Sequence, residues 1–424
     1  MSNEAPVTSA QKRIVSVLFV AQSFFSASSI AAFTLSPIIS SALSGTDSWV
    51  GLPNTITLLG RAGFALPLGI MMDRFGRRLA LSSGYSMAII GSAISVWAIV
   101  SGSFLIFLLG ALFLGMARSA GDQSRYVGAE VFTLSRRAKV IGIIVSAGTI
   151  GAILGPLLVP VSTTWMALLG LPEETGPFII SGILMLYATG AVFFFLRPDP
   201  RELGQAIAVQ EAAENPLSME NLIDERRPLR QIFASPMVQL AILAMVIGFF
   251  VMAFLMVITP LHMDRAAHTT AAISTVIMAH TLGMYGLSWL TGGLIDRFGR
   301  IPMILAGTAI LGVSCILAPL SLRVPILGLA LFLLGLGWNF CYVSGSSLLS
   351  DALAANERAR AQGASEALVA IGAGLASLSV GLVFAQGGYL AVSLIALFFT
   401  LLLAFLTYWL VRKDRRITAQ LAGS

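Results

Sequence analysis

The sequence predicts an all-α membrane protein with twelve transmembrane helices arranged as two parallel six-helix bundles. Three observations support this fold class. Hydrophobic residues make up 57% of the 424 residues and charged residues only 11%, about half the charged fraction of soluble domains, and the mean hydropathy is +0.88. Long apolar segments follow one another along the chain, and a charged sequence that separates two of them occurs twice.

Each apolar segment is long enough to cross a bilayer, which takes about 20 residues in a helix. Helices are expected because backbone polar groups must be satisfied within the lipid. The twelve segments lie at 14–40, 47–72, 79–100, 104–127, 139–160, 177–196, 237–259, 270–293, 302–320, 325–349, 361–385 and 389–411.

An internal duplication relates the two halves of the chain. The five residues Asp73–Arg77, between the second and third segments, recur as Asp296–Arg300 between the eighth and ninth. A glycine lies four residues before each copy, at Gly69 and Gly292. Parallel repeats of six helices are one architecture of secondary transporters. The duplication therefore predicts two halves that run in the same direction.

A second pair of charged positions supports this division, because Glu130 with Arg137 and Asp351 with Arg358 keep the same spacing in the two halves. The longest connection, after the sixth segment, is rich in Pro, Glu and Arg. We therefore expect an N-terminal six-helix bundle at 1–196, a cytoplasmic linker at 197–236 and a C-terminal six-helix bundle at 237–424.

The distribution of Lys and Arg predicts the orientation in the membrane. With the N-terminus inside, only Arg265 and Arg323 lie in outer loops. Because positive charge is concentrated in cytoplasmic loops, we expect a multi-pass protein of the cell membrane with both termini in the cytoplasm. The inner clusters lie at 12–13, 74–78, 136–139, 197–230, 297–300, 358–360 and 412–416.

Several classes of function are disfavoured by the composition. The formal net charge of +6 sits in short clusters between apolar segments, which argues against nucleic acid as a partner. The two cysteines, Cys315 and Cys341, lie inside apolar segments and are interpreted as core residues. The sequence lacks a phosphate-binding glycine loop and a metal-spaced His/Cys cluster. We therefore expect no enzyme activity, no cofactor and no metal site.

The charged motifs resemble those of the major facilitator superfamily of secondary transporters, over almost the whole chain. Gly69-x3-Asp73-Arg74-x-Gly76-Arg77-Arg78 resembles the signature between helices two and three, and Tyr126-x3-Glu130 with Arg137 resembles its companion after helix four. The resemblance implies that these loops form a cytoplasmic conformational latch; the alternative is that their arginines only set the topology. The latch residues are Gly69, Asp73, Arg74, Gly76, Arg77, Glu130, Arg137, Gly292, Asp296, Arg297, Gly299, Arg300, Asp351 and Arg358.

The fifth segment carries a glycine pattern, Gly142-x8-Gly151-x3-Gly155-Pro156. It resembles the motif of the antiporter branches of the superfamily, which include drug–proton exporters. The glycine pair that closes the motif is replaced by Val159–Pro160. The alternative is a packing groove, because small residues let membrane helices approach closely.

Charged residues inside membrane helices are costly and mostly functional. Arg61 and Arg118 each lie twelve residues before an acid of the charged loops, about 18 Å away along a helix and so near the middle of the bilayer. We expect both to bind substrate. The alternative is a structural ion pair, because Asp122 shares a helix face with Arg118 and Arg125.

Asp122 in the first half and Glu366 in the second are the acids well inside predicted helices. Burial raises the pKa of a carboxyl group and a nearby arginine lowers it, so both are candidates for proton coupling. The alternatives are a permanent salt bridge for Asp122 and a partly solvated acid near a helix start for Glu366.

The second half has uncharged side chains where the first half has charged ones, and Asn339 corresponds to Arg118. Trp338 and Tyr342 lie one turn apart and can stack on an aromatic substrate, although packing is the alternative for both. The two mid-membrane arginines outnumber Asp122, which suggests an anionic substrate. The proposed substrate-binding residues are Arg61, Arg118, Asn339, Trp338, Tyr342, Gln22, Asn54 and His280.

The leading hypothesis is a secondary transporter that exports a small organic molecule in exchange for protons by alternating access. The alternatives are a proton symporter or uniporter that imports an organic anion, a lipid translocase, and a receptor that binds without transport. The expected partners are a small-molecule substrate, protons and the lipid bilayer, and we expect a monomer.

Overall fold

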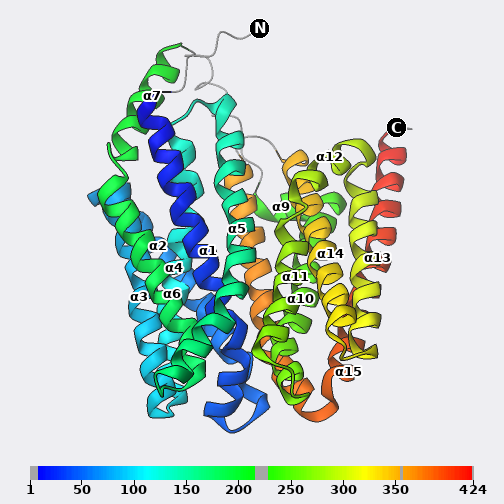
Figure 1. The fold of residues 1–424 in the computed structure, drawn as a ribbon. Coiled ribbons are helices and arrows are strands. Elements are labelled where there is room, and N and C mark those ends of the chain that lie inside the picture. Colours follow the sequence, from blue (N-terminus) through cyan, green and yellow to red (C-terminus); the bar gives the residue numbers. More distant parts are fainter. Residues whose placement is uncertain (1–7, 215–227, 354–356, 423–424) are drawn as a thin grey trace. The chain divides into compact units, whose positions relative to one another are not determined.

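The computed structural model describes residues 8–214, 228–353 and 357–422. Its described residues divide into two compact units (Figure 1). Unit 1 comprises Met1–Ile39 and Ile56–Ile223, and unit 2 comprises Ser40–Thr55 and Asp224–Ser424. The connection between the first two helices thus belongs to unit 2. Of the linker expected at 197–236, residues 215–227 lie outside the described residues.

The first half of the chain forms long helices with short connections. These are α1 (Ser9–Ser44), α2 (Leu52–Phe75), α3 (Arg77–Ser101), α4 (Phe104–Glu130), α5 (Leu134–Leu168), α6 (Gly176–Phe195) and α7 (Pro200–Glu214), with 3-10 turns η1 (Asp47–Trp49) and η2 (Glu173–Thr175). Local sequence sets the ends: Gly102 ends α3 in the left-handed conformation (φ 67°), and the Ser103 hydroxyl accepts from the backbone N–H of Ile106 to begin α4.

The second half is built in the same way. Its helices are α9 (Leu229–Ala234), α10 (Pro236–Arg265), α11 (Thr270–Tyr285), α12 (Ser288–Phe298), α13 (Arg300–Leu317), α14 (Val324–Asp351) and α15 (Arg358–Ala422), with the 3-10 turn η3 (Ala318–Leu320). α10 packs against α14 and α15, and α14 also packs against α11 and α13. The Pro at the first position of α10 is compatible with a helix start because that N–H has no intrahelical partner.

The twelve expected spans are present, but they do not correspond one to one to the helices. One span is divided into α11 and α12, and two spans are joined in α15. Among the described residues, ten helices are long and apolar enough to cross a membrane, or eleven when the bent pair α11–α12 counts as one span. As one continuous helix, the 57-residue apolar part of α15 would be about 86 Å long, far longer than a bilayer is thick. It is non-helical at Gly388 (φ 64°, ψ −167°), between the two spans expected at 361–385 and 389–411. The all-α fold class is therefore confirmed.

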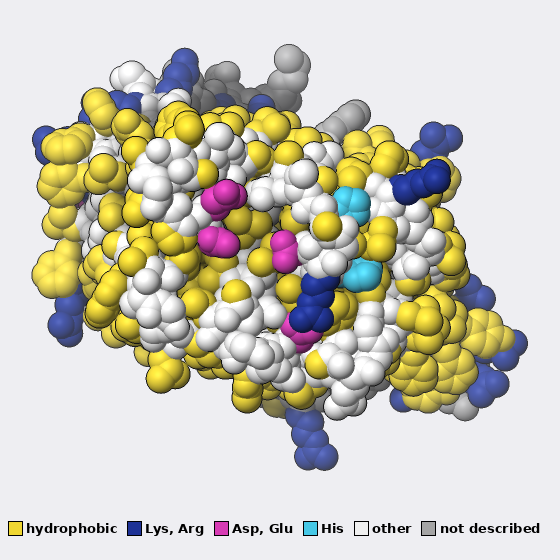
Figure 2. Space-filling model, turned by 60° about the horizontal axis from the view of Figure 1, so that its bottom comes forward, with side chains coloured by type: hydrophobic (Ala, Val, Ile, Leu, Met, Phe, Trp, Pro, Cys, Tyr) yellow, Lys and Arg dark blue, Asp and Glu magenta, His cyan; other side chains and the backbone are white. Residues whose placement is uncertain are grey.

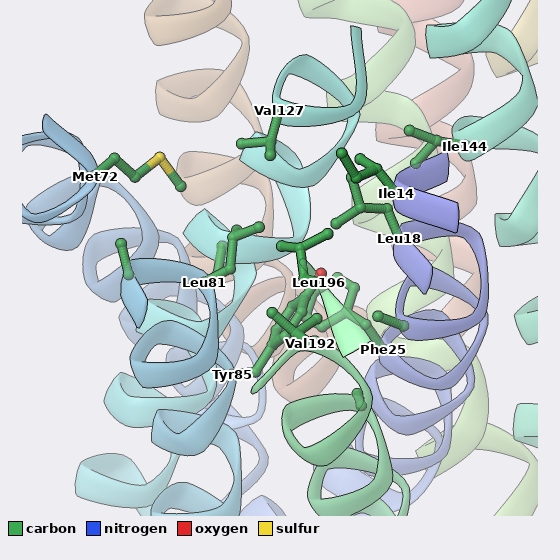
Figure 3. Packing of buried hydrophobic residues seen from close by; sticks show 14 of the residues in the cluster. Ile14, Leu18, Phe25, Met72, Leu81, Tyr85, Val127, Ile144, Val192 and Leu196 are labelled. Atoms are coloured by element: carbon green, nitrogen blue, oxygen red, sulfur yellow. The ribbon is translucent and has the colours of Figure 1, made fainter. Parts of the chain in front are cut away.

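The core of unit 1 is a layer of apolar side chains from α1 to α6 (Figure 3). Leu18 of α1, Leu81 and Tyr85 of α3, Ile144 of α5 and Val192 of α6 are all fully buried. A smaller core in unit 2 joins α9 and α10 to the end of α14 and the start of α15. Both cores include residues close to the charged motifs: Met72 and Ala80 in unit 1, and Leu349 in unit 2. The packing of these residues fixes the positions of the neighbouring helix ends.

Apolar side chains also cover much of the outside. Figure 2 shows one end of the molecule, where hydrophobic and uncharged groups dominate and charged side chains are few. Leu66, Leu105 and Leu168 are each more than 70% exposed. A lipid environment makes such exposure favourable, in contrast to water.

Candidate functional site

Arg77 is the centre of the charged motif in unit 1. Its Nε donates to Glu130 Oε1 (2.9 Å) at the end of α4, and its Nη2 donates to Glu130 Oε2 (3.2 Å). Its Nη1 donates to the carbonyl oxygen of Met72 (2.9 Å) and to Asp73 Oδ1 (3.1 Å) at the end of α2. One guanidinium therefore connects three helices, which its planar, multiply donating geometry suits.

Gly76 allows this arrangement because α2 and α3 meet at it in an extended conformation with positive φ (φ 86°, ψ 166°), a region essentially confined to glycine. A Cβ there would lie 2.5 Å from Asp199 Oδ2. The Asp199 carboxylate accepts from the backbone N–H groups of Arg77 and Arg78, both at 3.1 Å. It thus caps the start of α3 from the connection after α6.

The second copy of the motif reproduces this backbone. Gly299 has φ 88° and ψ 165°, almost the values at Gly76. Arg300 Nε lies 2.8 Å from Asp351 Oδ2, so the pair corresponds to Arg77 and Glu130. Within the described residues, Arg300 Nε nonetheless has no hydrogen-bond partner; the contact meets the distance of an ion pair but not the geometry of a hydrogen bond. The unit 2 copy is therefore the weaker of the two.

The other predicted latch residues contribute little contact. The side chains of Asp73, Arg74, Asp296 and Arg297 are exposed, and a Cβ at Gly69 or Gly292 would meet nothing within 4 Å. Arg137 Nε donates to the carbonyl oxygen of Phe132 (3.0 Å) and so holds the turn between α4 and α5. The side chain of Arg358 lies outside the described part of the chain. The latch itself stays a prediction.

The mid-membrane charges of unit 1 form one ion pair across two helices. Arg61 Nε of α2 lies 2.6 Å from Asp122 Oδ2 of α4, and each side chain is about one-third exposed (33% and 34%). The Ser119 hydroxyl donates to the carbonyl oxygen of Arg61 (2.5 Å) and ties the same two helices. Asp122 thus pairs with α2 and not, as its spacing in the sequence suggests, with Arg118 on its own helix.

The remaining polar candidates of unit 1 lie along α1 and α4. Gln22 Oε1 accepts from the Ser124 hydroxyl (3.0 Å). Arg125 stacks over the ring of Tyr126 (4.9 Å), and its buried Nε has no partner within the described residues. Arg118 is half-buried and forms no ion pair within the described residues. One mid-membrane cation therefore remains available to a ligand.

An aromatic cluster in unit 2 surrounds Trp338 of α14. Tyr342 stacks on it at 5.1 Å between ring centroids (22°), and Phe249 and Tyr285 meet it edge-on at 5.7 and 6.3 Å. The Tyr342 hydroxyl donates to Glu366 of α15, whose side chain is exposed. Trp338 Nε1 is buried and has no acceptor among the described residues. Two predicted substrate residues and one predicted proton site are thus in contact.

Asn339 has a structural role that its sequence position did not reveal. It is 2% exposed, its Oδ1 accepts from Thr291 Oγ1 (2.6 Å), and its Nδ2 donates to the carbonyl oxygen of Met284 (2.7 Å) and to Ser288 Oγ (2.9 Å). These partners flank the break between α11 and α12, which are inclined at 45°. Asn339 therefore satisfies the polar groups that the break releases, and is not exposed to a ligand.

His280 and Asn54 also have protein partners. His280 is 1% exposed and its Nδ1 lies 2.9 Å from the carbonyl oxygen of Leu331, whereas its Nε2 has no partner within the described residues. Asn54 Nδ2 donates to Ser377 Oγ of α15 (2.6 Å). In the described residues the packing interpretation fits His280, and the contact of Asn54 with Ser377 lies within unit 2.

A further polar contact of unit 2 joins Asp47 to Arg265 and was not predicted from the sequence. Asp47, 7% exposed, accepts from Arg265 Nη2 of α10 (2.6 Å) and from the Ser41 hydroxyl (2.7 Å). Arg265 also lies over the ring of Phe384 (5.7 Å). The signal was present, because Arg265 is one of two basic residues expected outside and Asp47 is an acid in the first outer loop.

The glycines of the fifth segment lie against α1. A Cβ at Gly151 would come 2.6 Å from the backbone nitrogen of Ala27, and one at Gly155 would come 2.9 Å from its carbonyl oxygen. Gly142 has open space, with nothing within 4 Å of its Cβ position. Pro156 lies within the continuous helix α5. Close packing thus requires two of the three glycines.

Comparison with known proteins identifies the family. The family model described as Major Facilitator Superfamily matches residues 17–291 and 240–423. The chain belongs to the major facilitator superfamily. An uncharacterised MFS-type transporter of Bacillus subtilis (strain 168), YdeG, is 34% identical over 403 residues, which cover 94% of this chain and 92% of that protein. The riboflavin transporter RfnT of Brucella anthropi is 29% identical over 384 residues, 90% of this chain and 91% of that protein.

Solved structures agree on the superfamily fold. A bacterial homolog of the human lysosomal transporter Spinster superposes with a TM-score of 0.71 at 16% identity, over 97% of this chain and 99% of that chain. A D-xylose–proton symporter also superposes with a TM-score of 0.71, at 14% identity, over 92% and 97% of the two chains. At these identities the likeness shows the fold alone. The family model and the 34% identical relative, and not these structures, show that the chain is a membrane transporter of this superfamily.

Proposed function

We propose that this transporter exports a small planar aromatic molecule in exchange for protons. The observation that carries the proposal is the contact of Tyr342 with both Trp338 and Glu366. Tyr342 stacks on the aromatic ring of Trp338, and its hydroxyl contacts the carboxyl group of Glu366, which can take up a proton. Substrate binding and proton binding are therefore coupled through a single side chain.

The coupling follows from the chemistry of the hydrogen bond. An ionised Glu366 accepts from the Tyr342 hydroxyl and fixes the ring on Trp338. A protonated Glu366 is a poorer acceptor and a donor of its own, so it releases the phenol to turn toward a ligand. Trp338 Nε1 is buried without a protein acceptor in the described residues, and in the proposal the movement of Tyr342 exposes this donor to the ligand. Proton loading thus changes the groups that the aromatic surface presents.

Unit 1 supplies a second carboxyl group. Asp122 Oδ2 lies 2.6 Å from Arg61 Nε. Protonation of Asp122 would free Arg61, and Arg118 has no ion pair in the described residues. Two guanidinium groups would then be available to an anionic or carbonyl-bearing substrate.

The substrate class is supported by a relative as well. RfnT of Brucella anthropi is named a riboflavin transporter, and riboflavin is a planar, hydrogen-bonding ring system that stacks on aromatic side chains. Riboflavin is therefore the first probe, followed by anionic and cationic planar dyes. If neither riboflavin nor any of the dyes quenches tryptophan fluorescence of the purified transporter, the proposed substrate class is wrong.

Proteoliposomes test the direction and the coupling. An acidic interior should drive accumulation of the substrate inside if protons leave as substrate enters, whichever way the protein is inserted. Accumulation driven by an acidic exterior would instead identify a proton symporter. Equal rates under both gradients would identify a uniporter. Movement of fluorescent phospholipid between leaflets, without movement of any dye, would identify a lipid translocase.

Glu366→Gln separates transport from proton coupling. Glutamine keeps an acceptor for Tyr342 but cannot take up a proton. We expect exchange of substrate at equal pH to persist within about threefold, whereas accumulation driven by the pH gradient is lost. Glu174→Gln, on an exposed outer turn, is the matched control and should behave as wild type. Gradient-driven accumulation by Glu366→Gln at the wild-type level contradicts the role of Glu366.

A further inference from the structure

A pocket in unit 1 lies outside the sites described above. It has a volume of about 580 Å³, within the range of small-molecule sites. The end of α2 and the start of α3 form one wall, and the connection from α6 to α7 forms the other. Its charged lining residues are Arg74, Arg78, Arg197, Arg201, Asp199 and Glu202.

The arginines of this pocket are not neutralised by the part of the chain that the structure describes. Within the described residues, none of the four guanidinium groups forms an ion pair with a carboxylate; Arg78 instead lies over the ring of Phe193 (5.8 Å). Asp199 is already occupied, because it accepts from backbone N–H groups including that of Arg201 (3.0 Å). Arginines outnumber acids in the lining by two to one. The pocket therefore has an unbalanced positive charge and many unused donors.

Exposed aromatic side chains border the same pocket. Phe75 lines it and is 62% exposed, and the end of α6 presents Phe193, Phe194 and Phe195, exposed by 41, 63 and 61%. Because Arg78 covers Phe193, the cationic and aromatic groups adjoin. Phenylalanine rings exposed at the end of a membrane span are apolar, so contact with lipid is more favourable for them than contact with water. One side of the pocket thus faces lipid.

We propose that this pocket binds the phosphodiester headgroup of an anionic phospholipid. Guanidinium groups bind phosphate oxygens bidentately, and basic pockets beside membrane helices bind anionic headgroups. The exposed phenylalanines contact the first part of the acyl chains, which favours a lipid over a soluble phosphate compound. On the orientation expected from the arginine distribution, the lipid comes from the cytoplasmic leaflet.

The position of the pocket gives the lipid access to the charged motif. Arg78 and Gly76 line it, and the intervening Arg77 connects α2, α3 and α4 through Met72 and Glu130. Asp199 already connects the α2–α3 junction to the start of α7. A bound headgroup adds a second connection between them. The lipid therefore stabilises the loop on which the motif depends, whatever substrate the transporter carries.

Native mass spectrometry of the full-length protein in detergent tests the proposal. Dioleoylphosphatidylglycerol and dioleoylphosphatidylcholine are titrated separately, and we expect at least tenfold tighter binding of the anionic lipid. Arg197→Gln/Arg201→Gln should remove most of that preference. Arg415→Gln/Arg416→Gln removes the same charge from exposed positions of α15 and should change the affinity less than twofold. Equal binding of the two lipids, or equal loss in both double variants, overturns the proposal.

Two further measurements complete the test. Gln205 lines the pocket and is exposed, so its substitution leaves the fold intact even if the arginine variant does not fold. Gln205→Glu should weaken phosphatidylglycerol binding several-fold and Gln205→Lys should strengthen it; the same sign for both overturns the proposal. Millimolar inorganic phosphate or glycerol phosphate should not displace the lipid. Full displacement assigns the pocket to a soluble phosphate compound instead.

Discussion

The ion pair between Arg61 and Asp122 allows a structural role and a transport role to be measured separately. Arg61 Nε and Asp122 Oδ2 are 2.6 Å apart, and each side chain is about one-third exposed. Breaking a fully buried pair costs about 3–5 kcal/mol, and an exposed pair contributes about 0–1 kcal/mol. For this partly exposed pair we expect Asp122→Asn to lower the free energy of unfolding by about 1–3 kcal/mol.

A double-mutant cycle isolates the pair. The free energy of unfolding is measured by titration with dodecyl sulfate in mixed micelles for wild type, Asp122→Asn, Arg61→Gln and the double variant. The double variant should lose less than the two single variants together, because both charges leave at once. Asp73→Asn is the control: its pair with Arg77 lies across the α2–α3 junction and Asp73 is 79% exposed, so the change should stay within about 0.5 kcal/mol.

The cycle and the transport assay give independent answers. A coupling energy below about 0.5 kcal/mol would show that the contact does not stabilise unit 1. Accumulation driven by a pH gradient in Asp122→Asn, at the wild-type rate, would remove Asp122 from the proton pathway. If stability falls and gradient-driven accumulation persists, the alternative of a permanent salt bridge is correct.

Five further substitutions test the scaffold, each by its effect on unfolding in mixed micelles. Arg77→Lys should cost at least about 1 kcal/mol more than Arg300→Lys, because one ammonium cannot keep the bonds of Arg77 to both α2 and α4; equal losses would contradict this. Gly76→Ala should cost about 1–3 kcal/mol because of its positive φ, whereas Gly69→Ala, with open space, should be neutral or stabilising. Gly151→Val should cost about 1–3 kcal/mol by overpacking against α1, and an unchanged stability would rule out that close packing.

The spans and the duplicated motif could be predicted from the sequence because their causes are local. About 20 apolar residues suffice for a membrane helix, and a glycine such as Gly76 or Gly299 marks a backbone conformation that other residues rarely adopt. Gly388, which separates the last two spans within α15, lies in the gap left between two apolar segments. No knowledge of distant contacts was needed for these features.

Contacts between helices were harder to predict, because they depend on how each helix is rotated. The spacing along α4 suggested that Asp122 pairs with Arg118, but α2 places Arg61 closer. The sequence also left open that α11 and α12 are separate, so the role of Asn339 at their break was hidden. Asp47 and Arg265 lie 218 residues apart, and sequence spacing carries no information about such a pair.

The two copies of the motif have the same backbone conformation at their glycine but differ in the contacts of the arginine side chain that follows it. Gly76 and Gly299 have nearly identical dihedral angles. The arginine that follows makes hydrogen bonds to two other helices in unit 1, whereas in unit 2 its Nε makes, within the described residues, an ion contact without a hydrogen bond. The pocket with unpaired arginines likewise adjoins the unit 1 copy. Since a lipid bound there would strengthen the junction that is already tighter, the membrane should affect unit 1 more than unit 2. The comparison of Arg77→Lys with Arg300→Lys, repeated with and without phosphatidylglycerol, measures this difference directly.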